Sequence, residues 1–145
     1  GVKVIEFNAR FGDPETEVVL PLLESDAYDV FYGIATGANN QSPIANSPLQ
    51  WKNEATIGVV LASKGYPGDY VKGAVIEGVE QFDGPVFHMG TKNDNGVLKT
   101  NGGRVMMCIA TGKDIAEAQA KVYKEIEKIH CDNLFYRKDI AHWAL

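Results

Sequence analysis

Three polar residues of different chemistry alternate along residues 4–15, which read VIEFNARFGDPE. In an extended strand, alternate side chains point to the same side. Glu6, Asn8 and Arg10 would therefore share one face, and the apolar residues between them would share the other. A carboxylate, an amide oxygen and a guanidinium in a row can hold a hard cation beside a phosphate. We take this stretch as a candidate metal and phosphate site.

A second interpretation of the same residues stays open. Alternation of this kind is also typical of a half-exposed strand whose polar face is solvated. An ion pair between Glu6 and Arg10 does not explain it, because positions i and i+4 on a strand lie ~13 Å apart. Asn is depleted in strands, so Asn8 needs a reason to stand here. From the residues alone, the site and the solvated face are equally open.

Composition indicates a folded globular domain and limits its partners. The 145 residues are 45% hydrophobic and 23% charged, which argues against disorder. A net charge of −5 gives no basic surface for nucleic acid or membranes, and no apolar stretch could span a bilayer. The two cysteines, Cys108 and Cys131, show neither zinc spacing nor a disulfide framework. We therefore expect a cytoplasmic protein that binds no nucleic acid and no membrane.

The candidate site needs a strand and a helix start to position it. We expect a strand over residues 2–11 that turns directly into a helix. Asp13 fits the N-cap, Pro14 the first helical position, and Glu15 an acid in the first turn. Such a helix start would offer backbone N–H groups to an anion.

The next segments are helical and end at a candidate domain boundary. The first helix should continue through Leu23, with Pro21 kinking or ending it. A second helix is expected over residues 27–34. Residues 37–48 are uncharged and rich in Asn, Ser, Gly and Pro, which predicts a linker.

Beyond the linker the pattern changes to short strands. We expect them at residues 56–62, 74–76, 85–88, 97–100 and 104–110. The last two flank Asn101-Gly102-Gly103, and we predict that they form a hairpin. Apolar residues at three- and four-residue steps predict one long helix over residues 113–129. The expected fold class is α+β, with a mainly antiparallel β domain after the opening strand and helices.

Five motifs follow one another along nearly the whole chain: VIEFNARFGDPETE, ASKGYPGDYVKG, VFHMGT, TNGGRV and FYRKDIAHWAL. In this order they resemble the glycinamide ribonucleotide synthetases (phosphoribosylamine–glycine ligases), a family of ATP-grasp enzymes. Ala9 departs from the family's frequent Cys, and Met89 from its frequent Ala. The resemblance covers only the last part of such an enzyme, in agreement with a chain that starts directly at Gly1 on a predicted strand. It implies the end of an ATP-grasp domain at residues 1–44 and the ligase's C-terminal domain at residues 45–145.

The resemblance also implies a reaction and its site residues. The family joins glycine to 5-phosphoribosylamine in purine (IMP) biosynthesis, while ATP becomes ADP and phosphate through a glycyl phosphate intermediate. By resemblance, Glu6 and Asn8 are ligands of Mg²⁺ or Mn²⁺, Asn8 and Arg10 bind ATP, and Arg10 is the catalytic cation. Asp13 and Glu15 could hold a substrate amine, or could simply cap the helix. The implied partners are glycine, 5-phosphoribosylamine, ATP and the rest of the ligase chain.

Other functions stay open beside this one. The chain could be a non-catalytic C-terminal module that packs on its partner domain, or part of another ATP-grasp acylphosphate ligase or carboxylase. RFGDPE and the C-terminal motifs favour the glycine ligase over the last of these. Without the nucleotide-binding half, this chain alone should be inactive. Arg104 could reach a phosphate, although a solvated Arg at the start of a strand is the simpler interpretation.

Overall fold

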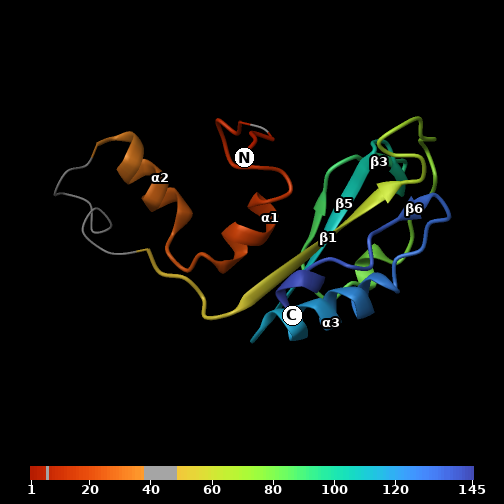
Figure 1. The fold of residues 1–145 in the computed structure, drawn as a ribbon. Helices are drawn as coiled ribbons and strands as arrows, with labels where there is room; N and C mark the ends of the chain where they lie inside the picture. The colour runs from red at the N-terminus through yellow and green to blue at the C-terminus, as the bar shows by residue number, and fades with distance from the viewer. Residues whose placement is uncertain (6, 38–48) are drawn as a thin grey trace.

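A four-stranded antiparallel sheet forms the centre of the protein, with strand order β2–β5–β1–β6 (Figure 1). The computed structural model describes residues 1–5, 7–37 and 49–145. The long central strands are β1 (Ala55–Ser63) and β5 (Arg104–Gly112), and the short outer strands are β2 (Val86–His88) and β6 (Leu134–Phe135). The predicted α+β class with mainly antiparallel strands is confirmed.

One face of the sheet carries the hydrophobic core. Side chains that alternate along β1 and β5 point to this face and meet helix α3 (Ile115–Ile126), which lies across it. The contacts of α3 come from Ala118, Val122 and Ile126, which are fully buried. These residues recur at three- or four-residue steps, as the sequence predicted. The core residues of the two strands are Ile57, Val59, Leu61, Met106, Cys108 and Ala110.

Helix α3 begins with a reciprocal cap. The Asp114 side chain accepts a hydrogen bond from the Glu117 N–H at 2.8 Å, and Glu117 Oε2 accepts one from the Lys113 N–H at 2.9 Å. These bonds satisfy two backbone donors that a helix start otherwise leaves without a partner. The predicted long helix is therefore confirmed, although it is shorter at both ends than residues 113–129.

The opposite face of the sheet is covered by helix α1 (Thr16–Val19). Here Met107 and Ile109 of β5 are buried beside Gly58 of β1. A Cβ atom on Gly58 would lie only 2.8 Å from Val18 Cγ1 of α1, so glycine allows the close approach of helix and strand. The segment that follows the candidate site is thus packed directly on the sheet.

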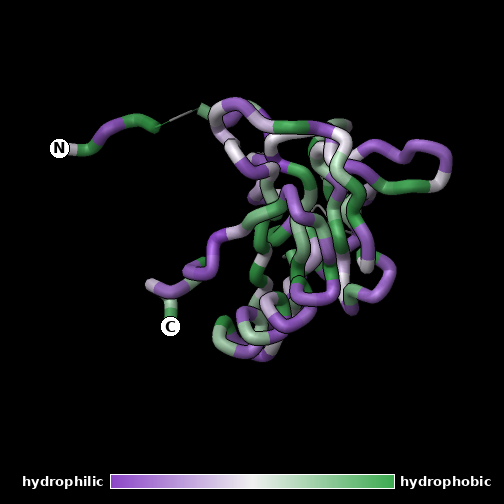
Figure 2. Tube along the Cα trace, turned by 90° about the vertical axis from the view of Figure 1, so that its right-hand side faces the viewer, coloured by the Kyte–Doolittle hydropathy of each residue, from purple (hydrophilic) through white to green (hydrophobic). Residues whose placement is uncertain are grey.

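The predicted strand over residues 2–11 is wrong for the described part of that segment. Residues 1–5 and 7–11 have no strand conformation, and in Figure 2 the first residues project away from the body of the protein. A strand exists through the hydrogen bonds of a neighbouring strand, and no described residue pairs with this segment. Its apolar side chains are exposed, with Ile5 at 97% and Phe7 at 91%.

The predicted helix start at Asp13 is also wrong. Helix α1 begins at Thr16 with Glu15 in the N-cap position, because the Gly12 carbonyl accepts from both the Thr16 N–H at 3.0 Å and Thr16 Oγ1 at 2.6 Å. The expected display of N–H groups to an anion is not found, since carbonyls of this same turn bind the N–H groups of Thr16, Val18 and Val19. The break at Pro21 is confirmed, because α1 gives way to the 3₁₀ helix η1 (Leu20–Leu22).

Helix α2 (Ala27–Ala35) confirms the second helical prediction. Its N-cap is Asp26, whose side chain accepts from the Asp29 N–H at 3.0 Å. Figure 1 shows α2 apart from the sheet. The predicted linker, apart from Gly37, lies outside the described residues, as does the boundary between residues 44 and 45.

The predicted hairpin of residues 97–100 with 104–110 is wrong. Strand β4 (Val97–Thr100) pairs with β3 (Thr91–Asp94), which the sequence analysis missed, whereas β5 joins the central sheet. Asn95 and Gly96 make the β3–β4 turn with φ of 53° and 86°, the positive values that a two-residue hairpin turn requires. Asn101-Gly102-Gly103 instead connects the two sheets.

Two smaller outcomes concern the remaining elements. The predicted strand at residues 74–76 is reduced to an isolated bridge between Val75 and Lys99. The 3₁₀ helix η2 (Val79–Gln81) precedes β2, and the 3₁₀ helix η3 (His142–Ala144) lies near the C-terminal end of the chain. Among the described helices, none combines the length and apolar character that crossing a membrane requires.

Candidate functional site

Two of the predicted site residues, Asn8 and Arg10, lie together on the surface. Arg10 Nη1 donates to Asn8 Oδ1 at 2.9 Å and to the Phe11 carbonyl at 2.9 Å. The amide oxygen and the guanidinium therefore face the same side, as the alternation predicted, although the segment is not a strand. Glu6, the other predicted metal ligand, lies outside the described residues.

Asp13 is bound to the start of strand β5. Arg104 Nη1 donates to the Asp13 carbonyl oxygen at 2.9 Å and lies 3.2 Å from Asp13 Oδ1. This contact joins residues that are 91 positions apart in the sequence. Asp13 is not the N-cap of α1, because that helix begins at Thr16 with Glu15 in the N-cap position. Arg104 is not merely a solvated side chain at a strand start.

Glu15 occupies the N-cap position of α1, but its side chain makes no capping hydrogen bond. Its carboxylate instead lies over Gly12, in the space that a side chain on Gly12 would fill. Gly12 is buried by this contact, while Glu15 remains exposed. The turn thus presents two carboxylates to solvent, one of them bound to Arg104.

The chemistry of these side chains fits the phosphate end of a metal-bound nucleotide. Arg10 offers a planar cation suited to a phosphate, and Asn8 places an amide oxygen 2.9 Å from it. In the described residues, no group of three or more His, Cys, Asp or Glu side chains could hold a metal by itself. Mg²⁺ needs only one or two protein carboxylates when phosphate oxygens and waters complete its shell. Asn8 and Arg10 are therefore compatible with such a site.

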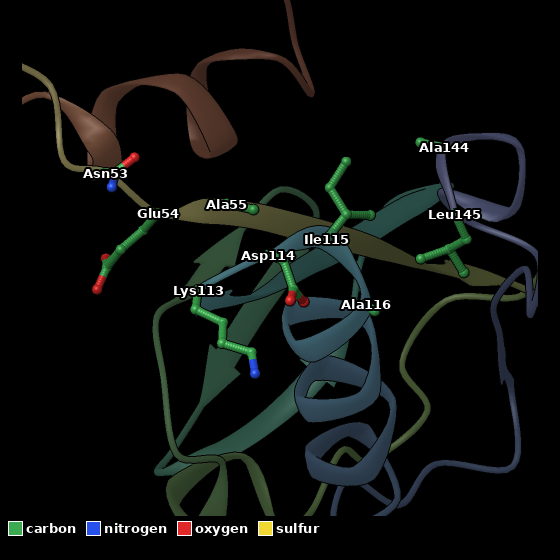
Figure 3. Close-up of a pocket in the computed structure, with 9 residues that line it drawn as sticks. All are labelled: Asn53, Glu54, Ala55, Lys113, Asp114, Ile115, Ala116, Ala144 and Leu145. Atoms are coloured by element: carbon green, nitrogen blue, oxygen red, sulfur yellow. The ribbon is translucent and has the colours of Figure 1, made fainter.

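Other reactive groups lie away from these residues. Burial raises the pKa of the Cys108 thiol to about 12, which excludes it as a nucleophile at neutral pH. A cleft of about 550 Å³ lies at the start of α3, and its lining includes Lys113, Asp114, Ala144 and Leu145 (Figure 3). Of its polar residues, Lys113 and Asp114 take part in the α3 cap described above, and the predicted site residues do not line it.

Arg104 lies beside the candidate site, and its partner Asp13 was not predicted from the sequence. Its contact with Asp13 depends on how the segment before α1 packs on the central sheet, and residue spacing carries no information about that. One signal was available, because Asp13 and Arg104 both belong to the motif series, in RFGDPE and TNGGRV.

Comparisons with known proteins cover the whole chain. Residues 56–143 match the family model described as "Phosphoribosylglycinamide synthetase, C domain". The chain is 52% identical to the phosphoribosylamine–glycine ligase of Halalkalibacterium halodurans, over 100% of this chain and 33% of that protein. It is 44% identical to the ligase of Pseudomonas aeruginosa, over 99% of this chain and 33% of that protein.

A solved structure gives the same correspondence. The crystal structure of phosphoribosylamine–glycine ligase from Thermotoga maritima matches with a TM-score of 0.80 and 36% identity. The match covers 95% of this chain and 33% of that one. The chain thus spans about a third of the length of the relatives it matches.

Proposed function

The chain belongs to the phosphoribosylglycinamide synthetase C-domain family, and on this basis we propose that it is the C-terminal third of a phosphoribosylamine–glycine ligase. The full ligase would join glycine to 5-phosphoribosylamine, with ATP converted to ADP and phosphate. The observation that carries this proposal is the 52% identity to the Halalkalibacterium halodurans ligase along the whole chain. That alignment includes the candidate site residues at the N-terminal end.

The two parts of the chain have different roles in this proposal. Residues 1–44 form the end of the ATP-grasp domain, and residues 45–145 form the C-terminal domain that packs against it. Large apolar side chains left exposed in the first part support this division, because the rest of the ligase would cover them. They are Val2, Val4, Ile5, Phe7, Phe11, Tyr28, Phe31, Tyr32 and Ile34.

The proposed catalytic role of the N-terminal segment is electrostatic. Formation of a glycyl phosphate brings a carboxylate up to a γ-phosphoryl group, and these two anions repel each other. Arg10 binds and orients the phosphoryl oxygens with its planar guanidinium. Glu6 and Asn8 hold the metal ion, which when bound supplies further positive charge at the phosphates. The Arg10–Asn8 hydrogen bond of 2.9 Å keeps the phosphate-binding and metal-binding groups adjacent.

Asp13 and Glu15 are the proposed contacts of the substrate amine. Both carboxylates are exposed, and neither caps α1 through its side chain. A carboxylate accepts hydrogen bonds from an amine and can orient it toward an acyl phosphate. The 145-residue chain by itself lacks the nucleotide-binding half, so we expect it to release no ADP.

The experiment that tests this proposal uses the full-length ligase carrying the chain. Wild-type enzyme should release ADP only when Mg²⁺, glycine and 5-phosphoribosylamine are all present. Glu6→Gln should reduce kcat by about 100-fold or more, with an unchanged unfolding temperature. Glu24→Gln is the matched control, since it removes the same charge from an exposed position of the same region. Normal ADP release by Glu6→Gln would reject the metal-ligand assignment.

A further inference from the structure

Among the described residues, the ion pair between Arg104 and Asp13 joins the N-terminal segment to the central sheet. The Arg104 guanidinium binds both the backbone carbonyl and the carboxylate of Asp13 through the same nitrogen, Nη1. The carboxylate contact is made by Oδ1 at 3.2 Å. The Arg104 contact therefore determines how the Asp13 carboxylate is turned.

The backbone on the Arg104 side is firmly held. The carbonyls of Gly102 and Gly103 accept hydrogen bonds at 2.8 Å from the Oγ and N–H of Ser63, which is completely buried. The Asn101 N–H donates to the Gly90 carbonyl at 2.7 Å. Strand β5 then begins at Arg104 itself. The guanidinium thus extends from a fixed point of the sheet.

The Asp13 side is held only within its own turn. Gly12 and Thr16 close the turn through the two hydrogen bonds from Thr16, but these bonds do not involve the Asp13 side chain. The direction of the Asp13 carboxylate relative to the sheet is therefore set by Arg104. Because the two side chains are 37% and 48% exposed, their ion pair should contribute little to folding stability. An orienting role fits this arrangement better than a stabilising one.

We propose that Arg104 is a positioning residue that holds the Asp13 carboxylate in the orientation needed to bind the amine of 5-phosphoribosylamine. The inference rests on the proposed function, which gives Asp13 this substrate contact. It adds that the C-terminal domain takes part in amine binding through the TNGGRV turn. Loss of Arg104 should then affect use of 5-phosphoribosylamine and leave use of ATP unchanged.

The test compares variants of the full-length ligase in steady-state kinetics. Arg104→Met should raise the KM for 5-phosphoribosylamine about 10- to 100-fold, with the KM for ATP and the unfolding temperature unchanged. Arg104→Lys keeps the charge and one donor, and should recover part of the loss. Arg137→Met is the matched control, because it removes another exposed arginine, paired with Asp139 at 2.7 Å on a different surface. It should behave as wild type.

A double variant shows whether Arg104 acts by positioning Asp13 or binds the substrate independently. Asp13→Asn with Arg104→Met should be no worse than Asp13→Asn alone, because both act through one carboxylate. Additive losses would overturn the inference, as would an Arg104→Met enzyme with normal KM for 5-phosphoribosylamine. Either result in an active wild-type ligase rejects only the role of Arg104. A wild-type enzyme without glycine- and 5-phosphoribosylamine-dependent ADP release would reject the proposed function itself.

Discussion

The two faces of the central sheet are covered in different ways. The face toward α3 is closed by three fully buried helix residues over an unbroken set of apolar strand side chains. The other face is covered by the four-residue helix α1, and the chain around it leaves Phe31, Tyr32 and Ile34 of α2 exposed. The comparison separates a C-terminal region, residues 55–145, that contains its own core from an N-terminal region, residues 1–52, whose described residues contribute none to that core.

The two faces of the sheet also differ in how well buried polar atoms are hydrogen-bonded. In the described part of the chain, two buried side-chain oxygens have no hydrogen-bond partner, Glu17 Oε2 and Thr56 Oγ1. Glu17 belongs to α1, and Thr56 lies on β1 in alternation with Gly58, on the side that α1 covers. Buried polar groups without partners are costly. Both oxygens lie where α1 meets β1, so the contact between the N-terminal region and the sheet satisfies its polar groups less completely than the core under α3.

The largest expected effect is on the free energy of unfolding, when one isoleucine from each region is replaced by alanine. Ile126→Ala should destabilise the 145-residue chain by about 2–5 kcal/mol, because it leaves a cavity in the core under α3. Ile34→Ala, at a side chain that is 75% exposed, should change the free energy of unfolding by less than about 0.5 kcal/mol. Urea unfolding of both variants measures this. Equal destabilisation would show that the N-terminal region shares the core.

A smaller effect is expected from the two aspartate N-caps. Asp114→Ala should lower the free energy of unfolding by about 1 kcal/mol, because α3 loses the acceptor of the Glu117 N–H. Asp26→Ala makes the same change at α2, but should leave the main unfolding transition in place, since α2 packs on little else. Thermal unfolding followed by circular dichroism distinguishes the two. An equal fall in the unfolding temperature of both variants would contradict the division into two regions.

The smallest effect concerns the charge at the start of α3. The hydrogen bond from Lys121, aided by the Lys113 N–H, holds the pKa of Glu117 below its usual value of 4.5. A lowered pKa in the folded state gives stability that is present above pH 4.5 and is lost as the pH falls through the folded-state pKa. The free energies of unfolding of wild type and Glu117→Gln should therefore differ at pH 6 and become equal at lower pH. The urea midpoints of both proteins, measured from pH 6 downward, test this prediction. A difference between the two midpoints that does not change with pH would contradict it.

Local signals predicted much of the fold. The apolar pattern of residues 27–34, the apolar spacing of α3 and the apolar run of β1 each determine structure over a few residues, and each of those elements was found. The hairpin prediction failed because the sequence offers two turns, Asn95-Gly96 and Asn101-Gly102. Strand pairing, which selects between them, is a property of the whole sheet.

In the candidate site, too, the sequence predicted local arrangement but not long-range contacts. The alternation along residues 6–10 placed Asn8 and Arg10 on one side, and their hydrogen bond agrees. The predicted strand did not form, because pairing needs a neighbour that the described residues do not provide. The contact of Asp13 with Arg104 spans 91 positions and follows from the packing of the α1 segment on the central sheet. No periodicity or spacing near either residue indicates it.

Hydrogen exchange of α2 and α3 tests the central claim most directly, when measured on the 145-residue chain and on the full-length ligase. The amides of residues 30–35 in α2 should exchange at least about tenfold more slowly in the full-length enzyme, because in the proposed ligase the remaining chain would cover that helix. The amides of α3 residues 118–126 should exchange at similar rates in both. Equal α2 rates in the two proteins would contradict the claim that the N-terminal region is one half of a larger structure.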